Sequence, residues 1–214
     1  MTKDTDSLWV FRIIPVQNLE NILREGMFCK SAGKNTSGFV TIGSQDVISR
    51  RDTKIVKCYP DTYVNDYVPF YFSVRTPMLY NIITGHGIPA KPQESIIYLG
   101  CKFSDLASDK FQWCYTNGNA AAAITRFYTT LEDIEHKIDW HSIDTTDFRD
   151  ENLDGDEDRI RKKHAEFLVK GHVPVDYIKA IVVLNAGKEK EVKTILGKLD
   201  LNIKVHINHK FYFV

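Results

Sequence analysis

The sequence predicts one domain of the α+β or mixed α/β class over residues 1–214. Strand-like and helix-like segments both occur along the chain, without the strict alternation that produces a parallel α/β sheet. A chain of 214 residues is long enough to bury one substantial hydrophobic core. Its 43% hydrophobic and 26% charged residues are ordinary for a globular domain, and no repeat or low-complexity linker divides it.

The first helix is expected over VQNLENILREG (16–26). Its apolar residues Leu19, Ile22 and Leu23 recur at the helical period and form one stripe. Gly26 follows at the position just past a helix C-terminus, where glycine is favoured because the backbone often turns left-handed there. The sequence therefore predicts a short helix with one buried face.

The middle of the chain is irregular before it becomes strand-like. Residues 29–66 are rich in Gly, Ser, Thr, Asn and Lys, and a long irregular segment inside a compact domain is more often functional than idle. Residues 67–80 contain Pro69 and Pro77, so they predict a strand that enters a shaped loop. The apolar run over 95–103 predicts a buried strand.

The second half of the chain mixes helices and strands. Asn119 is expected to cap a helix whose apolar positions run from Ala120 to Ile134 with a period of 3.6. The acidic segment that follows, up to Asp158, has no periodicity and is expected to be an exposed loop. The remaining expected strands are EFLVKG (166–171), YIKAIVVLN (177–185), NIKVHI (202–207) and KFYFV (210–214), with a helix over KEVKTILGKL (190–199).

Charge is balanced overall but unevenly placed. The formal net charge of zero argues against a protein that coats nucleic acid indiscriminately. Residues 24–57 nevertheless carry seven Lys or Arg against three carboxylates, whereas residues 132–158 carry twelve carboxylates against Lys137 and Arg149. Two solvated surfaces explain this pattern, and so does a local phosphate-binding site.

The sequence also indicates where the protein is located and whether it binds a metal. No apolar run approaches the roughly 18 residues of a membrane span, and the N-terminus does not resemble a signal peptide. We therefore expect a cytoplasmic protein with no membrane partner. The four cysteines form no CxxC pair and no cluster with zinc spacing, so inert thiols and no metal are expected.

Two motifs match ligand-binding patterns only superficially. Residues 85–90 (GHGIPA) fit the loose G-x-G-x-x-[G/A] pattern, but a strand follows where the phosphate-binding helix should begin. We therefore interpret them as a turn. Asp150, Asn152 and Asp154 match the first half of an EF-hand loop, but Arg161 stands at the twelfth position, which requires a bidentate glutamate. Calcium binding is not predicted.

Three features could carry chemistry. Glu166 begins an apolar strand, so it is either a solvated rim residue, which the spacing alone favours, or a partly buried acid with an assigned partner. Arg50 and Arg51 lie in the basic segment, and adjacent arginines are usually solvated, although a guanidinium suits a pyrophosphate or a carboxylate. The aromatic run over 70–72 is more typical of a core than of a stacking surface.

Five segments together resemble the DarT family of DNA ADP-ribosyltransferase toxins, over nearly the whole chain. They are NLENILREG (18–26), the double arginine after IGSQDVIS, DYVPFYFSVRTPMLYNI (66–82), YTNGNAAAAITRFY (115–128) and RKKHAEFLVKGHVPVDYI (161–178). The PFYF-x-x-R-[ST]-PML and AEFLV elements are the most specific. The resemblance implies the α+β ADP-ribosyltransferase fold, in which two small sheets splay around a cleft that holds NAD⁺, with peripheral helices.

The resemblance also implies roles for individual residues. Glu166 matches the catalytic glutamate, and the pair Arg50-Arg51 contains the catalytic arginine, with Arg51 favoured. Residues implied to contact NAD⁺ are Arg12, Asn18, Asn21, Arg51, Tyr71 and Met78. Residues implied to contact nucleic acid are Arg75, Thr116, Asn117 and Asn119, although the TNGN turn is as readily interpreted as the start of a helix.

One element departs from the family. Many members have a histidine in an H-[IV]-T element before the first helix, where it contacts the nicotinamide ribose. This chain has Phe11-Arg12-Ile13-Ile14 instead. Arg12 is a charged donor with longer reach, so its hydrogen bonding to NAD⁺ must differ from that of the histidine.

The function that follows is transfer of ADP-ribose from NAD⁺ to thymine or guanine in single-stranded DNA, with release of nicotinamide. NAD⁺ serves as substrate, no metal is needed, and a cognate antitoxin that removes ADP-ribose, such as a macrodomain protein, is the implied partner. The alternatives are an ADP-ribosyltransferase that acts on RNA or protein, and an inactive module that binds NAD⁺ or nucleic acid.

Overall fold

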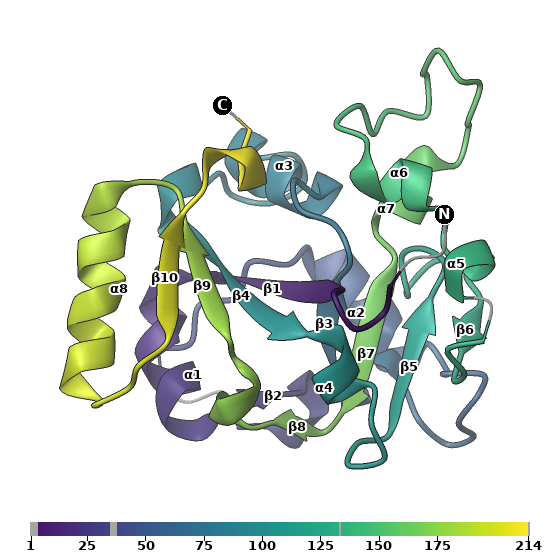
Figure 1. Cartoon of the computed structure of the whole chain (residues 1–214). Helices are drawn as coiled ribbons and strands as arrows, with labels where there is room; N and C mark the ends of the chain where they lie inside the picture. Colours follow the sequence, from purple (N-terminus) through teal and green to yellow (C-terminus); the bar gives the residue numbers. More distant parts are fainter. Residues whose placement is uncertain (1–3, 35–37, 133, 214) are drawn as a thin grey trace.

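A computed structural model describes residues 4–34, 38–132 and 134–213, which are arranged around a large mixed sheet (Figure 1). The strand order is β10-β9-β4-β1-β3-β7-β5-β6, and a second sheet pairs β2 with β8. The strands are β1 (Trp9–Pro15), β2 (Met27–Phe28), β3 (Tyr67–Tyr71), β4 (Ile96–Lys102), β5 (Trp113–Thr116), β6 (Phe127–Tyr128), β7 (Glu166–Lys170), β8 (His172–Val173), β9 (Ala180–Val183) and β10 (Lys204–Ile207).

The large sheet consists of two halves that meet at one point. β1 pairs with β4 along seven residue pairs, but with β3 only through Phe11 and Tyr71. Continuing that antiparallel register would place Pro69 opposite Ile13, and proline has no N–H to donate to a neighbouring strand. The Arg12 guanidinium instead donates to the Pro69 carbonyl oxygen at 3.4 Å. The halves therefore separate, as the expected splayed arrangement requires, although they remain joined in one eight-stranded order.

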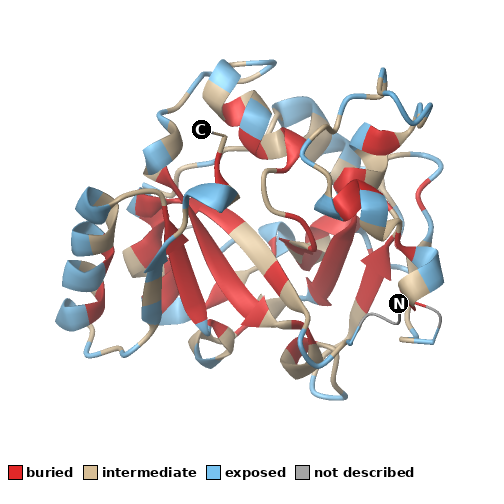
Figure 2. Cartoon of the chain, turned by 45° about the horizontal axis from the view of Figure 1, so that its top comes forward, coloured by how far each residue is buried: buried red, intermediate tan, exposed pale blue. Residues whose placement is uncertain are grey.

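Helices cover both faces of the half-sheet that contains β1 and β4. The longer helices are α1 (Leu19–Glu25), α2 (Gln45–Thr53), α3 (Pro77–Thr84) and α8 (Ala186–Lys198). The short helices are α4 (Phe103–Leu106), α5 (Ile134–Lys137), α6 (Trp140–Asp144) and α7 (Arg159–Lys163), with 3₁₀ turns η1 (Val16–Asn18), η2 (Lys30–Ala32), η3 (Val64–Asp66), η4 (Gln93–Ser95), η5 (Val175–Tyr177) and η6 (His209–Phe211). Figure 2 shows α8 exposed on its outer side, while Val192 and Leu196 are buried beneath it.

The expected helix from Ala120 to Ile134 was wrong. Turns occupy residues 120–124, β6 follows, and a helix begins only at Ile134. The helical spacing of the apolar residues is coincidental, because Ala120 packs beneath β7 and Phe127 pairs in β6, while Ile124 is 68% exposed. Tertiary packing gave each apolar residue a separate environment.

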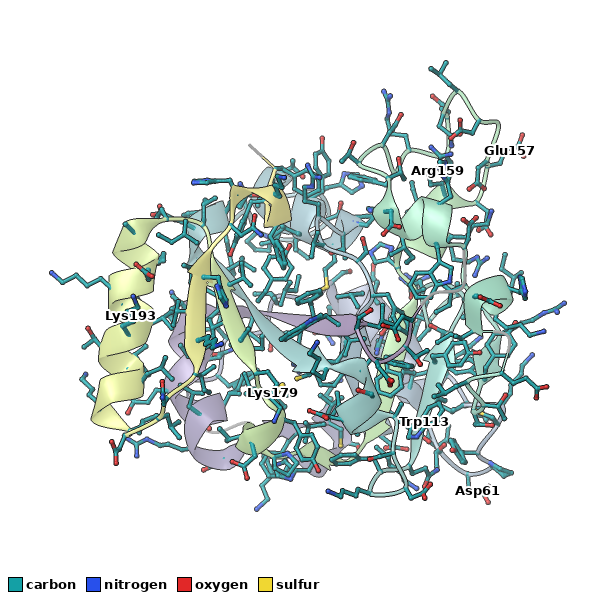
Figure 3. All side chains as sticks on the ribbon, viewed as in Figure 1. Asp61, Trp113, Glu157, Arg159, Lys179 and Lys193 are labelled. Carbon is teal, nitrogen blue, oxygen red and sulfur yellow. The ribbon has the colours of Figure 1, made fainter. Side chains whose placement is uncertain are left out.

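The acidic segment is only partly the expected exposed loop. It contains α5 and α6, which bury Ile134 and Ile143 against the core. The remainder projects away from the sheet between α6 and α7 and carries Glu157, whereas the buried Arg159 begins α7 (Figure 3). The partial EF-hand match lies in this loop, where Asn152 accepts hydrogen bonds from the backbone N–H groups of Asp154 and Asp156.

Two other predicted segments, 67–80 and 210–214, also differ from the structure. The segment 67–80 forms β3 and a loop as expected, but the helix α3 then begins at Pro77, because Thr76 caps it by accepting from the Leu79 N–H. The segment 210–214 is not a strand: its described residues belong to η6 and an irregular end, and Val214 lies outside the described residues. The other expected strands and helices are present within a few residues.

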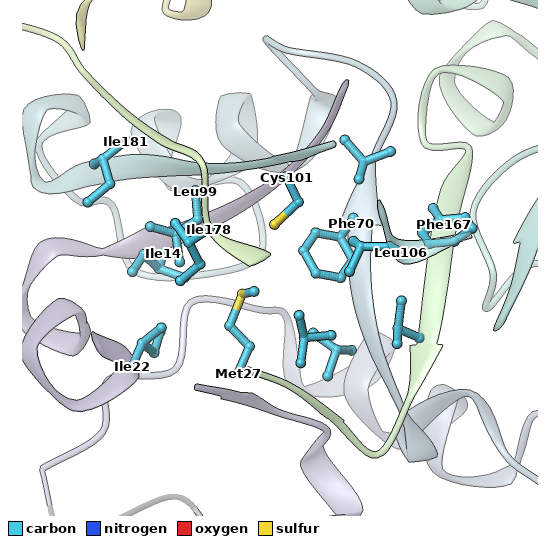
Figure 4. Close-up of a cluster of buried hydrophobic side chains, with 14 of the residues drawn as sticks. Ile14, Ile22, Met27, Phe70, Leu99, Cys101, Leu106, Phe167, Ile178 and Ile181 are labelled. Carbon is cyan, nitrogen blue, oxygen red and sulfur yellow. The ribbon is translucent and has the colours of Figure 1, made fainter. Parts of the chain in front are cut away.

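The core has a separate layer on each face of β1 and β4. On one face, Ile14 and Leu99 pack with residues of α1, such as Ile22, and with Ile181 of β9 (Figure 4). On the other face, a second cluster packs beneath α3 and the C-terminal segment: Ile13, Leu79, Ile82, Ile96, Tyr98, Val182 and Tyr212. Cys29, Cys101 and Cys114 are buried, and all four cysteines are free thiols.

Tyr212 tests how the C-terminal segment stabilises the sheet. Its hydroxyl is fully buried and lies 3.1 Å from the carbonyl oxygens of both Ile96 and Val182. Tyr212→Phe removes the donor from these buried acceptors, so we expect the free energy of unfolding to fall by about 1–2 kcal/mol. The half-exposed Tyr80 provides the control Tyr80→Phe. Equal urea midpoints for the two variants would contradict this role.

Candidate active site

Glu166 is buried, although the spacing of its strand favoured a solvated position. It begins β7, pairs with Tyr71 of β3 and is only 1% exposed. Its Oε1 accepts hydrogen bonds from the Ala120 backbone N–H at 2.9 Å and from Arg51 Nη1 at 3.0 Å. Its Oε2 lies 2.9 Å from the same Arg51 nitrogen. The carboxylate is therefore fixed by two donors from different segments.

Arg51 reaches Glu166 from α2, a helix in which no residue is buried. Asn65 anchors this helix, since its side-chain amide donates to the Ile48 carbonyl oxygen at 3.1 Å and to the Asp52 carboxylate. Arg50 lies elsewhere, with its Nε donating to the Asp46 carbonyl oxygen at 3.4 Å. Of the two adjacent arginines, only Arg51 contacts Glu166.

A cavity of about 320 Å³ opens beside this ion pair, within the size range of small-molecule sites. Its walls come from β1, the segment 39–44, α2, β3, α3 and β7, so it lies where the two halves of the sheet separate. Arg12, Tyr71 and Met78, all expected to contact NAD⁺, line it together with Arg51 and Glu166.

The cavity combines cationic and apolar walls. Two guanidinium groups, those of Arg12 and Arg51, line it beside the carboxylate of Glu166. Burial, followed by the nearby charge of Arg51, lowers the pKa of Arg12 to about 10. Tyr71 donates to Met78 Sδ at 3.0 Å, and burial, with the nearby Glu166, raises the pKa of its hydroxyl. Such a site suits an elongated ligand that carries a pyrophosphate.

Asn18 and Asn21 occupy different environments. Asn18 lines the cavity, and its side chain bonds both the N–H and the carbonyl oxygen of Val40, each at 2.8 Å. It thereby holds the segment 39–44 against the cavity. Asn21 lies outside the residues that line this cavity and instead borders grooves beside α1 with Glu25.

The residues expected to contact nucleic acid are dispersed. The expected contact of Thr116 with nucleic acid needs correction, because this residue is fully buried. Its hydroxyl donates to the Gly118 carbonyl oxygen at 2.7 Å and accepts from the Glu166 N–H at 3.0 Å. Asn117 accepts from the Arg126 N–H at 2.9 Å. Arg75 and Asn117 do not line the cavity, whereas Asn119 does.

The TNGN turn is held against α7 and starts no α-helix. A Cβ at Gly118 would lie 2.2 Å from Arg161 Nη1 and 2.9 Å from the Arg161 carbonyl oxygen, so glycine is required there. Asn119 donates its N–H to that carbonyl oxygen at 2.9 Å. This packing places the Ala120 N–H on the Glu166 carboxylate.

Sequence reasoning missed several cavity residues. His164 lines the cavity two positions before Glu166, and its place in KKHAEFLV was the signal that could have indicated it. His86 and Ile88 also line it. They belong to GHGIPA, which is confirmed as a turn because Gly85 ends α3 in a left-handed conformation and only the short 3₁₀ turn η4, not an α-helix, follows before β4.

Within the described parts of the chain, no three His, Cys, Asp or Glu side chains are grouped so that they could hold a metal ion. No helix among those residues is long and apolar enough to cross a membrane.

Comparison with known proteins identifies the family. A family model described as "ssDNA thymidine ADP-ribosyltransferase, DarT" matches residues 11–213. The chain belongs to the DarT family. It is 28% identical over 205 residues to a DNA ADP-ribosyl transferase of Escherichia coli O127:H6, covering 95% of this chain and 93% of that protein.

Solved DarT structures share the fold. Thermus sp. 2.9 DarT in complex with ADP-ribosylated ssDNA superposes with a TM-score of 0.88 at 26% identity, covering 100% of this chain and 99% of that one. The same protein in complex with NAD⁺ gives a TM-score of 0.80 at 25% identity, covering 96% and 97%. The predicted fold and the predicted NAD⁺-dependent DNA ADP-ribosyltransferase class are confirmed at the level of the DarT family.

Thr116 offers a test of the support beneath Glu166. Thr116→Val leaves the Gly118 carbonyl oxygen and the Glu166 N–H without their buried partner, so we expect a loss of about 1–3 kcal/mol in unfolding free energy. Thr116→Ser keeps the hydroxyl and loses one methyl group, which costs about 0.8 kcal/mol. Urea unfolding measures both. A serine variant as unstable as the valine variant would show that the hydroxyl is unimportant.

Proposed function

We propose that residues 1–214 act as one domain that transfers ADP-ribose from NAD⁺ to a thymine base in single-stranded DNA through Glu166 and Arg51. The observation that carries this proposal is the buried Glu166 carboxylate, paired with Arg51 at the cavity where the sheet separates. The family description supports thymine rather than guanine. The NAD⁺ and ADP-ribosylated ssDNA complexes of the Thermus sp. 2.9 protein support this pair of substrates.

The cavity residues fit NAD⁺ by charge and shape. The guanidinium of Arg12, which lines the cavity, provides donors for the pyrophosphate. Tyr71 and Met78, joined by their hydrogen bond, form an apolar wall for the nicotinamide half. Asn18 acts indirectly, because it holds the segment 39–44 in place.

The reaction requires a carboxylate near the ribose. NAD⁺ supplies the ADP-ribosyl group, and cleavage of its bond to nicotinamide develops positive charge on the ribose, as in glycosidase transition states. Glu166 stabilises that charge, and Arg51 and the Ala120 N–H orient the carboxylate beforehand. As the base nitrogen bonds to the ribose carbon, Glu166 accepts the proton that the nitrogen loses.

Two further parts of the proposal concern the cell. Because DNA and NAD⁺ are both present in the cytoplasm, we place the protein there. ADP-ribose on a DNA base damages the cell's own DNA. The producing cell therefore needs a cognate antitoxin that removes ADP-ribose from DNA. A macrodomain protein or a similar hydrolase fits that role.

The central test replaces the carboxylate with its amide. Glu166→Gln keeps the volume and an oxygen for the Ala120 N–H but loses the negative charge, so we expect DNA labelling to slow by about 100- to 1000-fold. Radiolabelled NAD⁺ and single-stranded oligonucleotides measure the rate. Glu191→Gln, on the exposed face of α8, is the matched control and should label DNA normally. A Glu166→Gln rate within a few-fold of the natural chain would remove Glu166 from the mechanism.

The acceptor is tested separately. Four oligonucleotides, each with a different base at one central position, are incubated with NAD⁺ and the protein. Fragmentation mass spectrometry then locates the added ADP-ribose, and we expect it on thymine. Modification of guanine would change the base assignment, and label on RNA or protein alone would replace DNA as the acceptor. Nicotinamide release from none of the mixtures would indicate an inactive binding module.

A further inference from the structure

Cys58 lies in a segment that folds back on itself after α2. The Val56 N–H donates to the Thr62 carbonyl oxygen at 2.9 Å, and Ile55 pairs with Tyr63 in an antiparallel bridge. These contacts close a loop that contains Cys58. The other three cysteines are buried, whereas Cys58 is only partly buried, so its thiol is the one that solvent reaches most readily.

The loop is fastened to β5, the strand that contains Cys114. The Tyr59 hydroxyl donates to the Trp113 carbonyl oxygen at 2.9 Å. Cys58 packs against a buried cluster that includes Cys114 and Leu168. The thiols of Cys58 and Cys114 are hydrogen-bonded to each other. Two cysteines that share no motif spacing in the sequence are therefore neighbours in the fold.

The two thiols differ in a way that favours oxidation at one of them. The hydrogen bond from Cys114 lowers the pKa of Cys58, whereas that hydrogen bond and burial raise the pKa of Cys114. The thiolate is the reactive form of cysteine, so oxidation begins at an accessible thiol with a lowered pKa. Cys58 thus has the properties of an attacking thiol, and Cys114 those of the resolving thiol beside it.

We propose that Cys58 and Cys114 form a reversible redox pair, which an oxidant of the peroxide class converts into an intramolecular disulfide. Neither cysteine is among the residues that line the cavity beside Glu166. Cytoplasmic thiol reductants keep such a pair reduced, so the bond forms when the oxidant exceeds them. The inference does not depend on the proposed transfer of ADP-ribose.

The oxidation consumes one hydrogen peroxide and two thiols. The Cys58 thiolate attacks one peroxide oxygen, so the O–O bond breaks, a sulfenic acid forms, and the released hydroxide takes up the proton that Cys58 lost. The Cys114 sulfur then attacks the Cys58 sulfur and displaces the sulfenic hydroxyl, which leaves as water with the Cys114 proton. The two thiols lose two electrons and two protons in total, and the peroxide becomes two molecules of water.

The disulfide would connect the two segments that support the ion pair of Glu166. The loop of Cys58 follows α2, which carries Arg51 in its last turn. Cys114 lies two residues before Thr116, whose hydroxyl accepts from the Glu166 N–H at 3.0 Å. A covalent link between these segments restricts the unfolded chain and ties the loop after α2 to β5. Oxidation therefore stabilises the fold around the ion pair.

Peptide mapping tests whether the bond forms. The natural chain is treated with hydrogen peroxide, unfolded, alkylated and digested with trypsin, which releases Cys58 and Cys114 in the separate peptides 58–75 and 111–126. We expect these two peptides to be joined and about 2 Da lighter than their sum, because two hydrogens are lost. The other two cysteines should be alkylated. Treatment with a thiol reductant before alkylation should make all four cysteines available again.

Thermal unfolding tests the consequence of the bond. The disulfide closes a loop of roughly 60 residues, so oxidation should raise the Tm of the natural chain by about 5–10 °C. Cys58→Ser loses the attacking thiol and should show no rise. Cys29→Ser removes a buried thiol elsewhere in the fold, so it is the matched control and should show the full rise.

Several results would overturn the redox pair. They are unjoined peptides after oxidation, a bond from either cysteine to Cys29 or Cys101, and a sulfinic acid at Cys58 while Cys114 stays free. An unchanged Tm of the natural chain, or an equal rise in Cys58→Ser, would also overturn it. These measurements contain neither NAD⁺ nor DNA. Their failure therefore leaves the proposed function intact, and a natural chain that labels no DNA leaves the redox pair intact.

Discussion

The ion pair between Arg51 and Glu166 is the interaction on which the site depends. Removing a carboxylate from water is costly unless it is paired and hydrogen-bonded, and here Arg51 and the Ala120 N–H satisfy it. A buried ion pair of this kind is weak evidence for stability. The pair instead fixes the position of α2, because this helix has no buried residue and Arg51 connects it to Glu166 of the sheet.

The cavity exists because the sheet is incomplete. Pro69 cannot continue the ladder between β1 and β3, and the Arg12 side chain takes the place of the missing strand contact. This contact also places the guanidinium of Arg12 at the cavity that opens between the two strands. The proline and the arginine therefore act at the same point of the sheet, and Glu166, the first residue of β7, lies at the edge of the cavity.

Polar tethers hold the segment that carries His164 and Glu166. Lys163 is buried, and its Nζ donates to Ser73 Oγ and the Ile143 carbonyl oxygen, both at 2.9 Å. Burial lowers the pKa of this amine to about 8. Arg161 fixes the opposite side of α7 to the TNGN turn. Lys163 and Arg161 thus fix α7, and with it the start of β7, from two sides.

The sequence by itself determined the strands β4, β7 and β9, the helices α1 and α8 and the family, because strong apolar patterns and specific local motifs specify them. Its local patterns did not determine the burial of Glu166, the choice of Arg51 over Arg50 as its partner or the loss of the expected helix after Asn119. Those outcomes depend on contacts between residues more than 40 positions apart, such as Ala120 with Glu166. Periodicity records which residues favour burial, whereas only the folded chain decides which partner each one meets.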